Sequence, residues 1–280
     1  MQSPWRSGGL GLLLVAPALA LVVALFAYPL GYSIVSALTV PEGGLGLANF
    51  AKAFELYSGD MLYTVFVVVS STALTALVAV AIAGYLTMGE TRWLVTGLAS
   101  LYRWPLFIPF IVAAQCMRTF LAKNGLANNT LVASGLIDAA DTVSLLDWRG
   151  VIITFVWKQA PFVALLLAGA MASIDRATIE AARNLGARRL RCLIEIVLPQ
   201  VAPTLMVALI LSFVTMLSVL SVPLMVAGSQ PTMLTVDMAF RINAYGDYPV
   251  ANALGVISYL MTAVVAWIYL RQSVRERGAA

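Results

Sequence analysis

Six charged side chains lie in one short segment, residues 180–199, which reads EAARNLGARRLRCLIEIVLP and separates two long apolar stretches. Glu180 offers a carboxylate to a basic partner, and four arginines follow it. These side chains can bind through charge. The chain has no histidine, and its two cysteines, Cys116 and Cys192, match no disulfide or zinc spacing. A catalytic triad or a metal site built on histidine is therefore excluded, and binding is the chemistry that remains.

The rest of the chain is unusually apolar. Of its 280 residues, 61% are hydrophobic and 11% are charged, whereas a soluble domain is about half apolar and about a quarter charged. The apolar residues occur in runs of about 20, which is long enough to cross a hydrocarbon core about 30 Å thick. We therefore predict an all-α polytopic membrane protein with six transmembrane helices, at about Leu10–Leu38, Leu62–Leu86, Trp104–Leu121, Val151–Ala172, Val201–Val226 and Val250–Leu270.

Two of these spans have alternatives. A cleaved signal peptide competes with the first span, but its apolar run continues through Tyr28, past the length of a signal core, so we expect a retained anchor. Residues 94–102 are either the early part of the third span or an interfacial helix beside it.

The distribution of Lys and Arg predicts the orientation. If both termini are cytoplasmic, that side holds eleven arginines, and the outer loops hold only Lys52, Lys123, Arg149 and Arg241. This bias places both termini, and residues 173–199, on the cytoplasmic side. The same bias accounts for the net charge of +4. The charge does not indicate nucleic-acid binding, because the chain offers no soluble basic domain.

The segment before Gly186 is predicted to form a short helix. Ser173 or Asp175 can cap its start, and residues 177–185 favour helix. Gly186 supplies a stop, because glycine tolerates a positive φ. One face of the helix carries an apolar stripe at spacing three: Ile179, Ala182 and Leu185. Pro199 and Pro203 are expected to open the next helix. By these features alone, the segment is either a docking helix for another protein or a helix that lies on lipid.

The spacing of specific residues separates these alternatives. Glu180-Ala181-Ala182, Gly186, Ile196 and Leu198-Pro199 fit the pattern E-A-A-x3-G-x9-I-x-L-P at every specified position. This pattern, after the fourth of six spans, resembles the EAA loop of importer permeases in the ATP-binding-cassette (ABC) superfamily. The resemblance implies a type I ABC importer (MetI-like) permease fold. It also implies a single permease domain over residues 1–280, with a core at about 62–270 and the EAA loop at 173–199.

The same resemblance implies a mechanism and partners. In that family the loop forms a coupling helix that docks on a cytoplasmic ATPase subunit, so that ATP-driven closure of two ATPases rocks the spans. The residues expected to make the contact are Glu180, Ala181, Ala182, Gly186 and Ala187. The implied partners are a second, homologous permease chain, two ATPase subunits, an external solute-binding protein and the bilayer of a bacterial inner membrane. This chain has no G-x-x-x-x-G-K-[ST] motif, so ATP and Mg²⁺ are expected on the ATPases, and this chain is expected to hold no cofactor and to be no enzyme.

Three stretches indicate a branch of the family. Residues 184–187, NLGA, resemble the "DLGA" of the spermidine/putrescine group more than the "IDGA" of sugar permeases. Residues 120–126 and 243–253 resemble segments of the same group, which also includes ferric-ion and phosphonate relatives. We therefore expect a small solute, either of polyamine type, a phosphonate or another small organic compound.

A few polar residues within the spans are candidates for the translocation path. Lys158 and Gln159 lie inside the fourth span, where a lysine costs roughly 2.5–3.5 kcal/mol and should face the bundle or a cavity. The alternative for Lys158 is a structural bond to a carbonyl or to a carboxylate of the second permease. Further candidates are Gln115, Arg118 and Ser218, although Arg118 can snorkel and Ser218 can serve helix packing. Lys158 and Arg118 would repel a dication and favour an anion.

Two other classes of protein remain as rivals. A membrane-embedded enzyme would need acids, His or Cys clustered within the spans. A secondary transporter driven by an ion gradient usually shows intramembrane carboxylates and internal repeats. Neither pattern occurs in this sequence, and the secondary transporter is the alternative that we retain.

Overall fold

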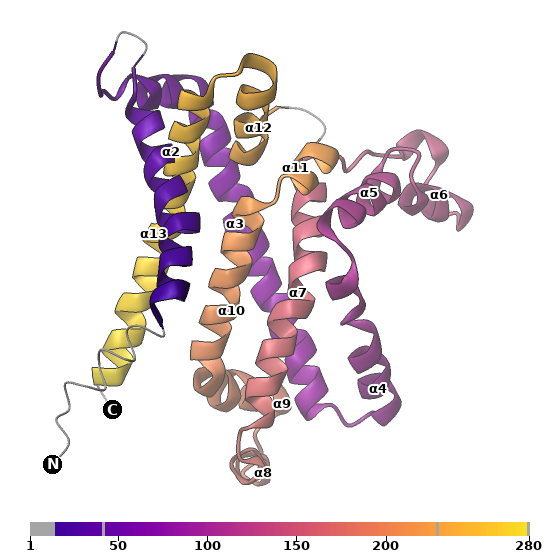
Figure 1. The fold of residues 1–280 in the computed structure, drawn as a ribbon. Coiled ribbons are helices and arrows are strands. Elements are labelled where there is room, and N and C mark those ends of the chain that lie inside the picture. Colours follow the sequence, from indigo (N-terminus) through magenta and orange to yellow (C-terminus); the bar gives the residue numbers. More distant parts are fainter. Residues whose placement is uncertain (1–14, 41–42, 228–229, 279–280) are drawn as a thin grey trace, which may run out of the picture. The chain divides into compact units, whose positions relative to one another are not determined.

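The computed structural model describes residues 15–40, 43–227 and 230–278 (Figure 1). Within these ranges the regular elements are helices, and Thr39 and Leu45 form an isolated β-bridge. Five helices are long and apolar enough to cross a membrane, and a bent pair of helices makes a sixth span if it is taken as one. The predicted all-α polytopic fold is therefore confirmed. The predicted start of the first span, residues 10–14, lies outside the described residues.

The first span is helical over Val15–Leu38, with a π-helical turn η1 (Val23–Ala27) before α2 (Tyr28–Leu38). The remaining elements are α3 (Ala48–Met88), α4 (Arg92–Leu101), η2 (Trp104–Phe107), α5 (Phe110–Leu121), α6 (Leu126–Ala133), η3 (Ala139–Asp141), α7 (Trp148–Ala172), α8 (Arg176–Asn184), α9 (Arg189–Cys192), η4 (Leu193–Val197), α10 (Leu198–Ser218), α11 (Ser221–Val226), α12 (Leu234–Tyr245) and α13 (Tyr248–Gly278).

The chain forms two compact units, and polar side chains hold the first together. This unit comprises residues 1–58 and 237–260. Within it, Ser33 Oγ donates to Asn252 Oδ1 at 2.8 Å, and Asn252 Nδ2 donates to Ser36 Oγ at 2.9 Å, which ties α2 to α13. Asp247 pairs with Lys52 at 2.9 Å and with Arg241 at 3.4 Å. Its carboxylate thereby joins α3 to the turn before α13.

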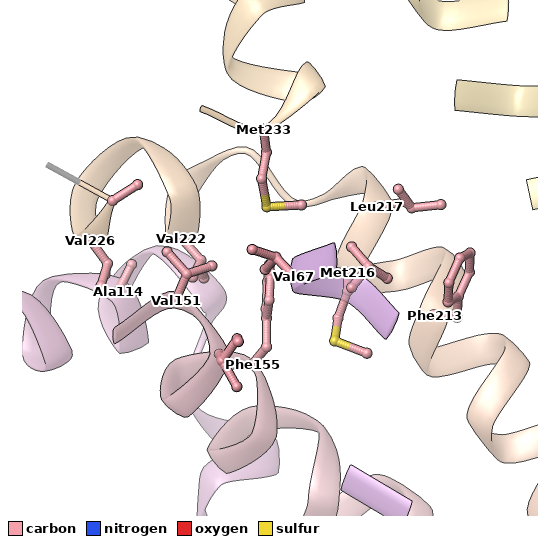
Figure 2. Close-up of a cluster of buried hydrophobic side chains, with 13 residues drawn as sticks. Val67, Ala114, Val151, Phe155, Phe213, Met216, Leu217, Val222, Val226 and Met233 are labelled. Atoms are coloured by element: carbon pink, nitrogen blue, oxygen red, sulfur yellow. The ribbon is translucent and has the colours of Figure 1, made fainter. Parts of the chain in front are cut away.

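The second unit, residues 59–236 and 261–280, is built around α7. This helix packs against α10, α5, α11 and η2, because its residues are apolar on all sides. The largest buried cluster lies where these helices meet, and Figure 2 shows the side chains of Val67, Phe155 and Met216 at its centre. The start of α7 is capped by Asp147, whose carboxylate accepts from Arg149 N at 2.8 Å. The hydrogen bonds from the Arg149 side chain hold the pKa of Asp147 below its ordinary value, so the cap stays ionised.

Three predicted boundaries are wrong. The fifth span ends at Ser218 rather than Val226, because Val219 takes an extended backbone and α11 begins anew at Ser221. The same span begins at Arg189 rather than Val201, because α9 and the π-turn η4 lead directly into α10. Pro199 lies in the first turn of α10, as predicted, whereas Pro203 lies inside the helix. The missing amide of Pro199 is accommodated at the end of that wider turn. The second span begins at Ala48 rather than Leu62, with a kink at Tyr57.

The region of the predicted third span consists of two helical segments that meet at a bend. Helical residues 92–107 and 110–133 meet at an angle of 109°. Pro109 explains the break, since it lacks an amide and disfavours helical geometry at the residue before it. Ile108 accordingly has an extended backbone with ψ 120°. Residues 94–102 form most of α4, a helix of its own on one side of this break.

Candidate functional site

The EAA loop forms the helix and turn that its sequence predicts. Asp175 is the cap of α8, with its Oδ1 accepting from Ala177 N at 2.9 Å, while Ser173 belongs to the end of α7 and donates to Ala170 O. Gly186 has a φ of +85°, and the amides of Gly186 and Ala187 donate back to the carbonyls of Arg183 and Ala182 at 2.9 and 3.0 Å. A left-handed glycine with these bonds closes a helix and turns the chain sharply.

The helix α8 extends from the end of α7 with none of its residues buried (Figure 1). Ile179 packs against the bundle, but Leu185 is 90% exposed, so the predicted apolar stripe is wrong at its last position. The five residues expected to contact an ATPase lie together on this helix and the turn after it: Glu180, Ala181, Ala182, Gly186 and Ala187. An exposed leucine beside small residues suits a surface that another protein covers.

Beneath α8, a cluster of buried side chains connects the loop to three spans. Ala83 of α3, Leu167 of α7 and Val197 of η4 belong to it, and Ile179 of α8 packs on its edge. The contact of α3 with η4 is close: a Cβ on Gly84 would lie 2.8 Å from Leu193 Cδ2. Through this cluster, α8 is in packing contact with three spans.

The side chain of Lys158 lies at the break of the third span. Its Nζ donates to the carbonyl of Pro105 and, at 2.6 Å, to that of Ile108. The ammonium lies 5.0 Å from the centre of the Phe110 ring, and only 6% of the residue is exposed. These bonds match the structural alternative for Lys158, in which the lysine binds a backbone carbonyl. Its place in the translocation path stays a prediction.

The other path candidates are distributed over three helices. Gln159 on α7 is 5% exposed, and its Nε2 has no hydrogen-bond partner among the described residues. Arg118 on α5 is exposed. Ser218, at the end of α10, donates to Val214 O at 2.7 Å, so its own helix satisfies its hydroxyl. The structure does not bring these residues into contact with one another.

Gln115 lines a cavity, and so does an aromatic residue to which the sequence analysis assigned no role. The cavity has a volume of about 530 Å³ and is bounded by Gln115, Cys116, Met117, Thr119, Phe120, Leu126 and Trp157. Trp157 stands next to Lys158 in the chain. A large aromatic ring beside an amide and a hydroxyl is a common lining for small-molecule sites. The signal in the sequence is a Trp within an apolar span, next to Lys158.

Neither cysteine pairs in the described structure: Cys116 is exposed and Cys192 is buried. In the part of the chain that the structure describes, no group of three or more Cys, Asp or Glu side chains could hold a metal ion.

The sequence was compared with protein families and with known proteins. A family described as "Binding-protein-dependent transport system inner membrane component" matches residues 60–277. The sulfoquinovosyl glycerol transport system permease protein SmoG of Agrobacterium fabrum is 27% identical, over 94% of this chain and 89% of its own. The trehalose/maltose transport system permease protein MalF of Thermococcus litoralis is 27% identical, over 95% and 94%. The spermidine/putrescine permease PotB of Salmonella typhimurium is 23% identical, over 81% and 79%.

A solved structure carries the same fold. A chain of the bacterial alginate ABC transporter in complex with alginate pentasaccharide-bound periplasmic protein has a TM-score of 0.79, with 21% identity, and the match covers 96% of each chain. The likeness extends over the full set of spans and confirms the predicted helical fold.

Proposed function

The chain belongs to the family of binding-protein-dependent transport system inner membrane components, and from this premise we propose that it is one of two permease subunits of an ATP-driven importer. As a member of this family it is a multi-pass, non-catalytic protein of the inner membrane. In the proposed complex it pairs with a second, homologous permease, two ATPase subunits and an external binding protein. Both termini and the EAA loop face the cytoplasm, which agrees with the Lys and Arg bias of the loops.

The observation that carries the coupling role is the exposure of α8 and of the turn at Gly186. A helix that only connected two spans would bury an apolar face, but no residue of α8 is buried and Leu185 is 90% exposed. A cleft on an ATPase that covers Glu180 through Ala187 accounts for this arrangement. The buried cluster beneath Ile179 then conveys the motion of α8 to α3, α7 and α10.

Co-purification and energy dependence test this proposal. The protein, expressed with its ATPase, is expected to co-elute with it, and transport in membrane vesicles is expected to need ATP and to survive a protonophore. Transport that stops with the protonophore and continues without ATP would favour the ion-gradient-driven secondary transporter instead.

For the solute, we propose a carbohydrate or glycoside rather than a polyamine. The SmoG and MalF relatives are named for sulfoquinovosyl glycerol and for trehalose and maltose, and they match more of this chain, at higher identity, than PotB does. The cavity at Trp157 supports the same class, because a sugar ring can lay its apolar face on an indole while Gln115 and Thr119 bond its hydroxyls. The branch suggested by residues 184–187 is therefore not favoured.

A solute panel separates the classes. The assembled complex, with its binding protein, is tested for stimulation of ATP hydrolysis by sulfoquinovosyl glycerol, trehalose, maltose, spermidine and putrescine. We expect stimulation by a member of the sugar group. Stimulation by spermidine or putrescine alone would restore the polyamine assignment. If the active sugar is an anion, the exposed side chain of Arg118 is a candidate to bind its charge.

Trp157 provides a prediction for the path. Trp157→Ala is expected to lower uptake of the stimulating sugar about tenfold, which corresponds to about 1.4 kcal/mol, because the stacking surface is lost. Trp157→Phe keeps a ring and should retain most of the uptake. Hydrolysis of ATP in the absence of sugar serves as the control and is expected to stay within twofold of wild type in both variants. Equal uptake by Trp157→Ala and wild type would remove this cavity from the path.

A further inference from the structure

The turn between α3 and α4 carries an acidic side chain that contacts the EAA loop at two points. One oxygen of Glu90, Oε1, lies 3.1 Å from Nη2 of Arg183 and also pairs with Nη2 of Arg189. Arg183 lies in the last turn of α8, whereas Arg189 is the first residue of α9. Glu90 therefore bridges the two helices on either side of Gly186.

The turn that presents Glu90 is closely packed. Gly89 N donates to Tyr85 O at 2.8 Å, and a Cβ on Gly89 would lie 2.5 Å from that oxygen and 2.8 Å from Val95 Cγ2. Only glycine permits such an approach. The turn comprises residues 89–91 alone, between the end of α3 and the start of α4. The carboxylate is thus fixed to the end of α3 through a short connection.

We propose that Glu90 is a positioning residue of the coupling mechanism: it sets the angle between α8 and α9 about Gly186 and links that angle to the end of α3. The inference rests on the proposed function, since it assigns Glu90 a part in transmitting the motion of α8. A cavity of about 620 Å³, lined by Glu90, Arg183 and Arg189 together with Arg176 and Glu180, lies beside the bridge. This space gives α8 room to move when the bridge opens.

The exposure of the Glu90 ion pairs indicates that they orient α8 and contribute little to the stability of the fold. The side chains of Glu90, Arg183 and Arg189 are 63%, 50% and 40% exposed. Exposed ion pairs contribute little to folding, because water screens them. The angle at Gly186 is also held by local backbone bonds, by the bond from Cys192 Sγ to Ala187 O and by the packing of Ile179 on the buried cluster. The bridge adds a link from the Glu90 turn to the helices on both sides of Gly186.

Glu90→Gln tests the bridge, with Glu195→Gln as the matched control. Glu195 pairs with Arg191 at 2.8 Å and the pair is similarly exposed, but both residues lie in one helical stretch and bridge nothing. The complex with its ATPase is reconstituted in nanodiscs, and hydrolysis is measured with ATP alone, without binding protein. Spin labels on Thr96→Cys in α4 and Thr178→Cys in α8, with both native cysteines replaced, report the distance between the two helices.

We expect Glu90→Gln to raise hydrolysis at least threefold and to double the width of the distance distribution, because the ATPases then cycle without the spans. Glu195→Gln should change neither. Glu90→Asp keeps the carboxylate and should hold hydrolysis within twofold of wild type, which shows that Glu90→Gln acts through the lost charge and not through a loss of fold. Wild-type hydrolysis in Glu90→Gln, or the same rise in Glu90→Asp as in Glu90→Gln, overturns the proposal. Absence of ATPase from the purified wild-type complex would instead contradict the proposed function itself.

Discussion

Gly186→Asp is expected to abolish transport while the protein stays in the membrane in normal amounts. Gly186 has a φ of +85°, and a Cβ placed on it would meet no atom of this chain within 4 Å. The substitution therefore costs only the backbone strain, about 1–2 kcal/mol, without a clash inside the permease. The larger effect falls on the docked ATPase, since a carboxylate at the turn fills the space that the partner must enter. Membrane content by immunoblot and uptake of the stimulating solute measure the two effects separately.

A second left-handed glycine provides the control for strain. Gly135 has a φ of +71° and equally open surroundings, but it lies in the loop between α6 and η3. Gly135→Asp introduces the same strain and the same charge far along the chain from α8, and it should transport at wild-type rates. Gly186→Ala, with its small side chain, is expected to retain part of the uptake. Normal uptake by Gly186→Asp would count against docking at this turn.

The elements that follow directly from local sequence were predicted well. The cap at Asp175, the helix after it and the left-handed Gly186 are properties of neighbouring residues, and the structure contains all three. The end of the fifth span was not predicted, because Val219 and Leu220 are as apolar as the helix before them. Hydropathy measures transfer into lipid, so it does not report where an apolar chain leaves the helical conformation.

The partners of Lys158 could not be read from the sequence for a related reason. The cost of a buried lysine indicated that it must be satisfied, but the carbonyl of Pro105 lies 53 positions away along the chain. The sequence analysis did not predict the break at Pro109, at which the lysine binds two carbonyls. The bridge at Glu90 was missed in the same way, since its three residues come together only through tertiary packing.

Lys158→Met is expected to destabilise the protein and to reduce transport in proportion. The methionine has a similar volume and removes the charge, which relieves the desolvation of the ammonium. It also removes both hydrogen bonds to the carbonyls at the break, and each buried carbonyl left unpaired costs about 1–3 kcal/mol. Since bonds to a charged donor are stronger than neutral ones, we expect the loss to exceed the relief by about 2 kcal/mol, or on the order of 5 °C in Tm.

The native cysteines distinguish a structural role of Lys158 from a role in the path. Cys116 on α5 is exposed, whereas Cys192 is buried, so alkylation of Cys116 reports the orientation of the helix that the lysine holds, and Cys192 reports global unfolding. In Lys158→Met we expect a lower Tm and at least a threefold change in the alkylation rate of Cys116, with Cys192 still protected. Lys158→Arg retains the charge and the donors and should recover most of the Tm. If the methionine variant instead keeps the wild-type Tm and alkylation rate but loses uptake, Lys158 is assigned to the path. In that case the side chain affects transport without affecting the stability of the bend at Pro109, as a group that contacts the solute would.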